Sequence, residues 1–140
     1  RFLDKTMLAR LRRIELLTPY LDDRFRELGP EAFEEEGEGF SPVNGRRLTN
    51  LGTFRVYVER YLRSLPDLRQ DLTFLVRQLD PGPTGIPLEL YVFTATTQWG
   101  AYEAIQADIF DHLLASARAF GLKVFQYPAH AEQMPWGQQP

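Results

Sequence analysis

The chain has 140 residues, of which 44% are hydrophobic and 13% aromatic, so it can form one domain with a folded core. A net charge of -3 gives no support to binding of nucleic acid, which needs a concentrated basic face. No cysteine is present, which excludes disulfides, thiol catalysis and zinc–thiolate sites.

Residues 1–30 carry the pattern of an N-terminal helical arm. Asp4 is a good N-cap for a helix that begins at Lys5, and apolar side chains then recur at helical spacing. Thr18 is predicted to cap a second short helix, because a proline follows it where helices accept proline. Gly29, with the proline after it, is predicted to end that helix.

Residues 31–43 are predicted to form an acidic linker in solvent. Five glutamates fall between Glu31 and Glu38. A partner-binding patch or a calcium loop is the alternative interpretation. The spacing lacks the alternating Asp and Asn ligands of a calcium loop, so a solvated linker is favoured.

Residues 44–128 show the clearest alternation of strand and helix patterns. We predict a helix capped by Asn50 or Thr53, a second helix over 100–120, and strands at 46–50, 72–79, 88–96 and 122–127. The order β-α-β-β-α-β is that of an α+β, ferredoxin-like domain, in which two helices cover one face of an antiparallel sheet. Residues 129–140 are predicted to be a flexible tail.

The helix predicted over 100–120 is apolar on more than one side. Phe110 and Leu114 lie roughly 100° or more around the helix from its core stripe, too far for one sheet face to cover both. These two residues are therefore candidates for a contact between subunits. The alternative is that the helices between residues 5 and 28 cover them within one chain. The core stripe is predicted to consist of Tyr102, Ile105, Ile109, Leu113, Ser116 and Phe120.

Asp108, Asp111 and His112 are the nearest approach to a catalytic cluster. Asp108 and His112 are one helical turn apart, so they could share a metal ion or act as an acid–base pair. A metal would need further ligands, and the other histidine, His130, lies in the predicted tail. The favoured interpretation is a half-buried His112 oriented by Asp108. We therefore predict no catalytic, metal or cofactor site, and no enzyme.

Two further pairs of residues have alternative interpretations. Arg46 and Arg47 could bind an anion near the start of the following helix, but pairing of one of them with an acidic neighbour is favoured. Met134 and Trp136 stand out in the polar tail. They are either an exposed docking segment or, as favoured, terminal residues that pack back on the domain.

Several long runs of the sequence resemble the C-terminal cytosolic region of MscS-like mechanosensitive ion channels, in the YbdG-like miniconductance branch. The resemblance covers roughly residues 1–127. It excludes the acidic segment at 34–38. The runs are LLTPYL at 16–21, RRLTNLGTFR at 46–55, DLTFLVRQL at 71–79, GIPLELY at 85–91 and YEAIQADIFDH at 102–112.

This resemblance implies that the chain is part of a membrane channel of identical subunits, heptameric where the family architecture is established. It implies membrane-spanning segments upstream of Arg1 and a location in the cell inner membrane, with this domain facing the cytoplasm. The domain would contribute to the vestibule, to assembly and to gating under hypo-osmotic membrane tension. The alternative is a stand-alone regulatory module of ferredoxin-like fold that binds a small ligand between subunits.

Overall fold

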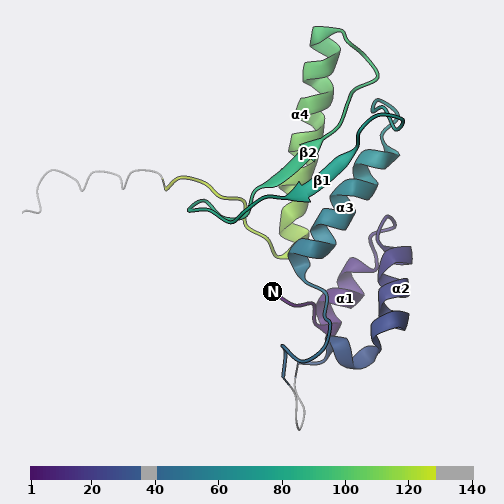
Figure 1. Ribbon diagram of the computed structural model, residues 1–140, viewed down its shortest axis with the longest axis vertical. Helices are drawn as coiled ribbons and strands as arrows, with labels where there is room; N and C mark the ends of the chain where they lie inside the picture. Colours follow the sequence, from purple (N-terminus) through teal and green to yellow (C-terminus); the bar gives the residue numbers. More distant parts are fainter. Residues whose placement is uncertain (36–40, 129–140) are drawn as a thin grey trace, which may run out of the picture.

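The computed structural model describes residues 1–35 and 41–128. The fold is α+β, with four α-helices, two short 3-10 helices and one two-stranded antiparallel sheet in this part of the chain. Figure 1 shows α1 and α2 at one end of the molecule and the hairpin with α3 and α4 at the other. In chain order the elements are α1 (Lys5–Leu11), α2 (Thr18–Leu28), η1 (Pro30–Phe33), α3 (Asn50–Ser64), β1 (Leu75–Gln78), β2 (Leu88–Tyr91), α4 (Trp99–Ser116) and η2 (Ala117–Phe120).

The N-terminal arm contains the two predicted helices, with one correction at a cap. Asp4 accepts a hydrogen bond from the backbone N of Met7 at 2.6 Å, which confirms it as the N-cap of α1. Thr18 does not cap α2, whose N-cap is Leu17. The Thr18 hydroxyl instead donates to the carbonyl oxygens of Arg12 at 2.8 Å and Ile14 at 3.2 Å. A threonine that bonds backward to the preceding turn lies inside the helix and not at its cap position.

The first residues of the predicted acidic linker belong to the folded core. Phe33, at the end of η1, is completely buried. The Arg47 guanidinium donates to the carbonyl oxygens of Ala32 and Glu34, each at 2.8 Å. These contacts attach the segment after α2 to the segment before α3. Residues 36–40, which hold two of the five glutamates, Glu36 and Glu38, are outside the described residues.

The predicted amphipathic helix forms as α3, but neither Asn50 nor Thr53 is its N-cap. The cap is Thr49, whose hydroxyl oxygen accepts from the backbone N of Gly52 at 3.0 Å. Asn50 lies in the first turn and is buried, and its side-chain amide donates to the carbonyl oxygen of Phe120 at 3.0 Å. This bond connects the start of α3 to the end of η2. The buried apolar residues of α3 are Phe54, Tyr57, Val58 and Leu62.

The predicted hairpin is confirmed, with strands shorter than the sequence pattern. β1 and β2 pair antiparallel, with Leu75 opposite Tyr91 and Gln78 opposite Leu88. A bridge between Leu68 and Thr94 continues the pairing beyond the strands. One face of the hairpin packs toward the core. That face carries Phe74, Val76, Leu88, Leu90 and Val92.

The two predicted outer strands are wrong, because neither segment joins the β1–β2 sheet. Leu48 accepts from the backbone N of Leu3 at 2.8 Å, and Thr49 forms an isolated bridge with Phe2. Segment 46–50 therefore has its backbone partners in residues 1–3 and not in the hairpin. Residues 122–127 have no strand assignment. The ferredoxin-like order is thus only partly formed in this chain.

α4 and η2 together cover the predicted helix 100–120. Gly121 follows in the left-handed conformation with φ of 65°, which glycine adopts readily after a helix, and Gly29 ends α2 with φ of 80°. No helix within residues 1–35 and 41–128 is long and apolar enough to span a membrane. The tail, 129–140, lies outside the described residues.

Candidate functional site

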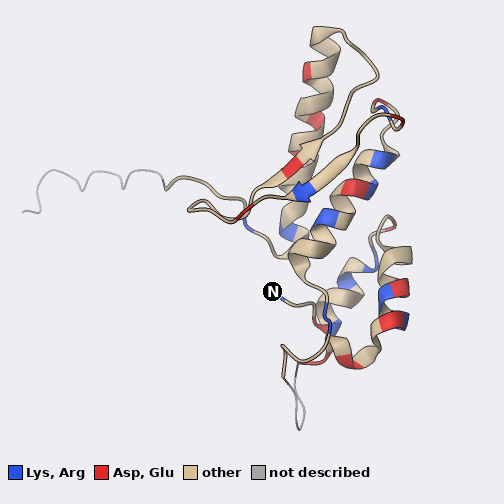
Figure 2. Ribbon diagram, viewed as in Figure 1, with Lys and Arg blue, Asp and Glu red and all other residues tan. Residues whose placement is uncertain are grey.

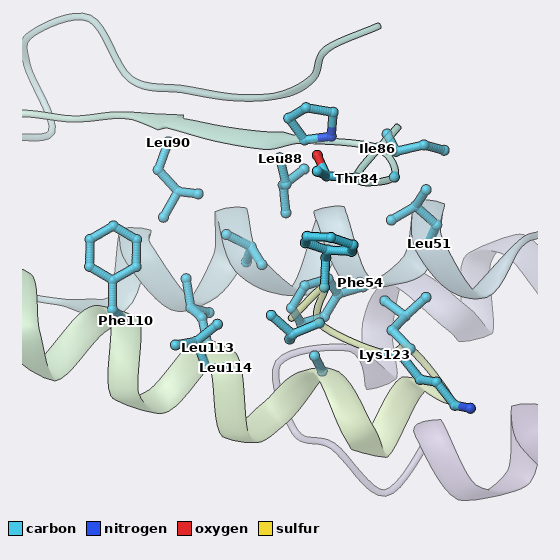
Figure 3. Close-up of a pocket in the computed structure, with 17 residues that line it drawn as sticks. Leu51, Phe54, Thr84, Ile86, Leu88, Leu90, Phe110, Leu113, Leu114 and Lys123 are labelled. Carbon is cyan, nitrogen blue, oxygen red and sulfur yellow. The ribbon is translucent and has the colours of Figure 1, made fainter. Parts of the chain in front are cut away.

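An apolar groove of about 500 Å³ lies between the hairpin, α3 and α4. Figure 3 shows β2 above the groove, α3 behind it and α4 below it, with side chains from all three converging. The hairpin turn and residues 122–125 complete the walls. The inner lining includes Phe54, Val58, Leu88, Leu90, Leu113 and Ala117.

The lining carries very little polar chemistry. Thr84 and Lys123 are the two side chains among the lining residues that carry a polar group. A volume of about 500 Å³ falls within the roughly 300–1,000 Å³ that is usual for small-molecule sites. The lining therefore favours apolar occupants, with one cation at the edge for an acidic group.

Phe110 and Leu114, the sequence-predicted contact residues, line this groove and remain 48% and 52% exposed. In Figure 3 both side chains rise from α4 toward β2. The alternative in which the N-terminal helices cover them is wrong, because half of each side chain is open to solvent. The buried residues of α4 are Ile109 and Leu113 alone, so the helix packs along a narrow stripe.

The predicted core stripe of α4 is buried only toward its C-terminal end. Tyr102 is 39% exposed and Trp99, one turn earlier, is 76% exposed, whereas Phe120 is completely buried. Charges on α4 are limited to three exposed acidic residues, and Figure 2 shows long uncharged stretches along this helix. The first part of α4 thus projects beyond the core with aromatic side chains in solvent.

Apolar exposure continues from α4 into the neighbouring walls. Ile86 is 46% exposed, Val124 48% and Phe125 47%. With Phe110 and Leu114 they form one region around the groove, which we call the open apolar face. Scattered apolar residues on a surface are ordinary, but a contiguous apolar region of this kind marks an interaction site.

Asp108 and His112 do not form the predicted pair. His112 is exposed, and its Nε2 lies 2.6 Å from the hydroxyl oxygen of Tyr57 on α3. The imidazole also stacks on the ring of Tyr61, with centroids 4.1 Å apart. No group of three His, Asp or Glu residues that could hold a metal ion occurs among residues 1–35 and 41–128. His130 lies outside those residues.

The structure connects His112 to α3, which sequence reasoning missed. Tyr57 and Tyr61 are four residues apart and so project from one side of α3. This aromatic stripe on α3 was the sequence feature that could have indicated a contact with another helix. Burial is the main cause that raises the pKa of Tyr61, and the nearby Tyr57 and Asp108 raise it further. The cluster therefore acts as a contact between two helices.

Arg46 pairs with an acidic neighbour, as the sequence predicts: its guanidinium lies 3.0 Å from a carboxylate oxygen of Glu27. Arg47 is occupied by backbone carbonyl oxygens and lies over the ring of Phe2 at 5.3 Å. Both arginines thus have partners within the N-terminal half. Met134 and Trp136 lie outside the described residues.

No protein-family model matches the chain, and no solved structure matches it.

Proposed function

We propose that the chain is the cytosolic C-terminal domain of a homo-oligomeric, MscS-like mechanosensitive channel of the YbdG-like branch. In this role the domain contributes to the vestibule, to assembly and to the modulation of gating under hypo-osmotic membrane tension. The full-length protein lies in the cell inner membrane, with this domain in the cytoplasm. The proposal rests on the sequence runs that resemble the family, including YEAIQADIFDH at 102–112.

The observation that carries the proposal in the structure is the open apolar face. Phe110 and Leu114 are about half exposed although they sit beside buried Ile109 and Leu113. Leaving such side chains in water forgoes the hydrophobic stabilisation that burial gives, about 25 cal/mol per Å². A contact with an identical subunit buries them, and symmetry repeats that contact in every copy.

The ferredoxin-like fold is part of the same proposal. The order α3-β1-β2-α4 is the central part of the β-α-β-β-α-β order. Both α3 and α4 line a groove on one side of β2. A two-stranded sheet is marginal by itself, and further strands stabilise it. Segment 122–127 is the candidate to extend the sheet when subunits assemble.

The first test is the reading frame upstream of Arg1. The channel proposal expects several apolar segments of about 20 residues there. A start codon directly before Arg1, with no such segment, would remove the channel and leave a domain that associates through its open apolar face.

The second test concerns assembly of the intact channel. Phe110→Asp places a charge in the subunit contact and is expected to reduce the oligomer mass in detergent and to lower tension-activated current in pressure-clamp recording. Val43→Asp is the matched control, because Val43 is 75% exposed and lies outside the groove lining. Equal masses for both variants and the parent would contradict the proposed contact.

The groove also supports a second candidate function, a regulatory module that binds a small apolar ligand. Its volume and lining suit such a ligand, and Lys123 at its edge would pair with an acidic group. A rise in melting temperature with a panel of apolar carboxylic acids, lost in Leu114→Asp, would favour this function over assembly alone.

A further inference from the structure

The open apolar face is hollow, which limits what can fill it. Phe110 and Leu114 line the groove together with Leu88 and Leu90 of the hairpin (Figure 3). Two hollow surfaces placed face to face do not fill each other. The occupant must therefore present protruding apolar side chains on a narrow segment of chain.

Two segments of this chain lie outside the described residues, and only one of them fits. Residues 36–40 join Glu35 to Ser41, so both of their ends are fixed next to the N-terminal arm. Residues 129–140 follow directly on Pro128, beside the groove wall formed by residues 122–125. They contain Met134 and Trp136, with Pro135 between them, within an otherwise mostly polar run. Trp and Met side chains give large apolar contact area.

The last described residues run outward from the body of the fold (Figure 1). Residues 122–125 form a groove wall, but Tyr127 is already 82% exposed. Figure 1 shows segment 122–128, in yellow-green, running outward from the end of α4 beyond the body of the fold. Trp136 is eight residues past Pro128, a reach of up to about 26 Å.

We propose that the segment 129–140 of one subunit binds in the apolar groove of the next, with Met134 and Trp136 against Phe110 and Leu114. Glu132, two residues before Met134, supplies the acidic partner for Lys123 at the groove edge. This inference rests on the self-association in the proposed function and names the segment that makes the contact.

The direction of this contact fits a cyclic assembly. A segment-to-groove contact joins two different surfaces, and a contact of this kind closes into a ring when its rotation divides the circle. A contact of the groove with itself would stop at a pair of subunits. The segment-to-groove contact therefore has the head-to-tail direction that a ring of identical subunits requires.

The chain offers a direct spectroscopic test, because it contains two tryptophans and Trp99 is 76% exposed. In a Trp99→Phe chain, Trp136 is the only tryptophan. Its fluorescence maximum is expected at short wavelength when the chain is assembled. On dilution the maximum should shift to the longer wavelength of a water-exposed indole. Adding Leu114→Asp should produce the exposed spectrum at every concentration. The spectrum of an exposed indole in the assembled chain would overturn the inference.

A cross-linking test separates contact between chains from contact within a chain. The sequence has no cysteine, so introduced thiols are unique. Thr84→Cys, at the groove, and Gly137→Cys, next to Trp136, are placed in separate chains, mixed and treated with a short bis-maleimide. A cross-linked heterodimer is expected. Val43→Cys mixed with Gly137→Cys is the control and should give none. Cross-linking only when both cysteines are in one chain overturns the inference.

Deletion of 129–140 distinguishes this inference from the proposed function. The shortened chain is expected to lose oligomer mass, as Phe110→Asp does. Trp136→Ala is expected to raise the protein concentration needed for assembly by roughly tenfold or more, as for a buried aromatic anchor. If the shortened chain assembles normally while Phe110→Asp does not, the contact exists but another segment fills the groove. If neither change alters the mass, both proposals fail.

Discussion

The two ends of the molecule use apolar side chains in opposite ways. In the N-terminal arm the leucines at positions 3, 11, 17 and 21 and Phe33 are completely buried. Around the groove, Phe110 and Leu114 remain about half exposed although α4 carries fewer charges than α2. The arm is closed by chain segments that return over it. The groove has no such segment among the described residues, so its apolar surface remains available for an intermolecular contact.

The contrast predicts a large difference between two leucine substitutions. Leu17→Ala removes a completely buried side chain and should cost about 2–5 kcal/mol of unfolding free energy. Leu114→Ala, at a side chain that is 52% exposed, should change the monomer by less than about 1 kcal/mol. Urea unfolding of both variants at low protein concentration measures the difference. Equal losses would show that the groove is as closed as the arm.

The junction between α3 and η2 gives a smaller expected effect. Asn50 is buried, and its amide donates to the carbonyl oxygen of Phe120 at 3.0 Å. Asn50→Ala leaves that carbonyl without its partner and should cost about 1–3 kcal/mol. Ser116→Ala is the control, because its hydroxyl bond to the carbonyl oxygen of His112 lies at the surface. Both are measured by urea unfolding, and a similar cost for the two would contradict the importance of the junction.

The contact of α4 with α3 near His112 predicts an alkaline effect. The pKa of Tyr61 is raised chiefly by burial, so ionisation is less favourable in the folded chain than in the unfolded one. The stabilisation is therefore fully present below the unfolded pKa, near 10, and is lost as pH rises through the folded value. Tyrosinate absorbance should show one late-titrating tyrosine that disappears in Tyr61→Phe. An unchanged titration curve would contradict this packing.

The smallest expected effect lies in the loop before the hairpin. The Arg69 guanidinium donates to both carboxylate oxygens of Asp71, at 2.7 and 2.6 Å, and lowers its pKa to about 2. The stabilisation from this pair is present above the unfolded pKa of Asp71 and is lost as pH falls through about 2. Arg69→Gln should return the Asp71 titration toward 3.8, as followed by carboxyl NMR. Because both groups are at the surface, overall stability should change little.

Local features of the sequence determined much of the fold. The cap at Asp4, the helix ends at Gly29 and Gly121 and the alternation in the hairpin all depend on residues within a few positions of each other. Short-range hydrogen bonds and steric limits decide such features, so they can be predicted from sequence. The apolar excess on α4 is equally local, and it identifies Phe110 and Leu114 from the sequence pattern alone.

Tertiary structure decided which segments become partners. The segment 46–50 has a strand pattern, yet its backbone bonds go to residues 1–3. The pairing of Tyr57 with His112 joins positions far apart in the chain. Segments with similar local patterns compete for the same partners, and only the packing of the whole chain determines which contact forms. The groove arises in the same way, because no described segment covers the space between β2 and α4.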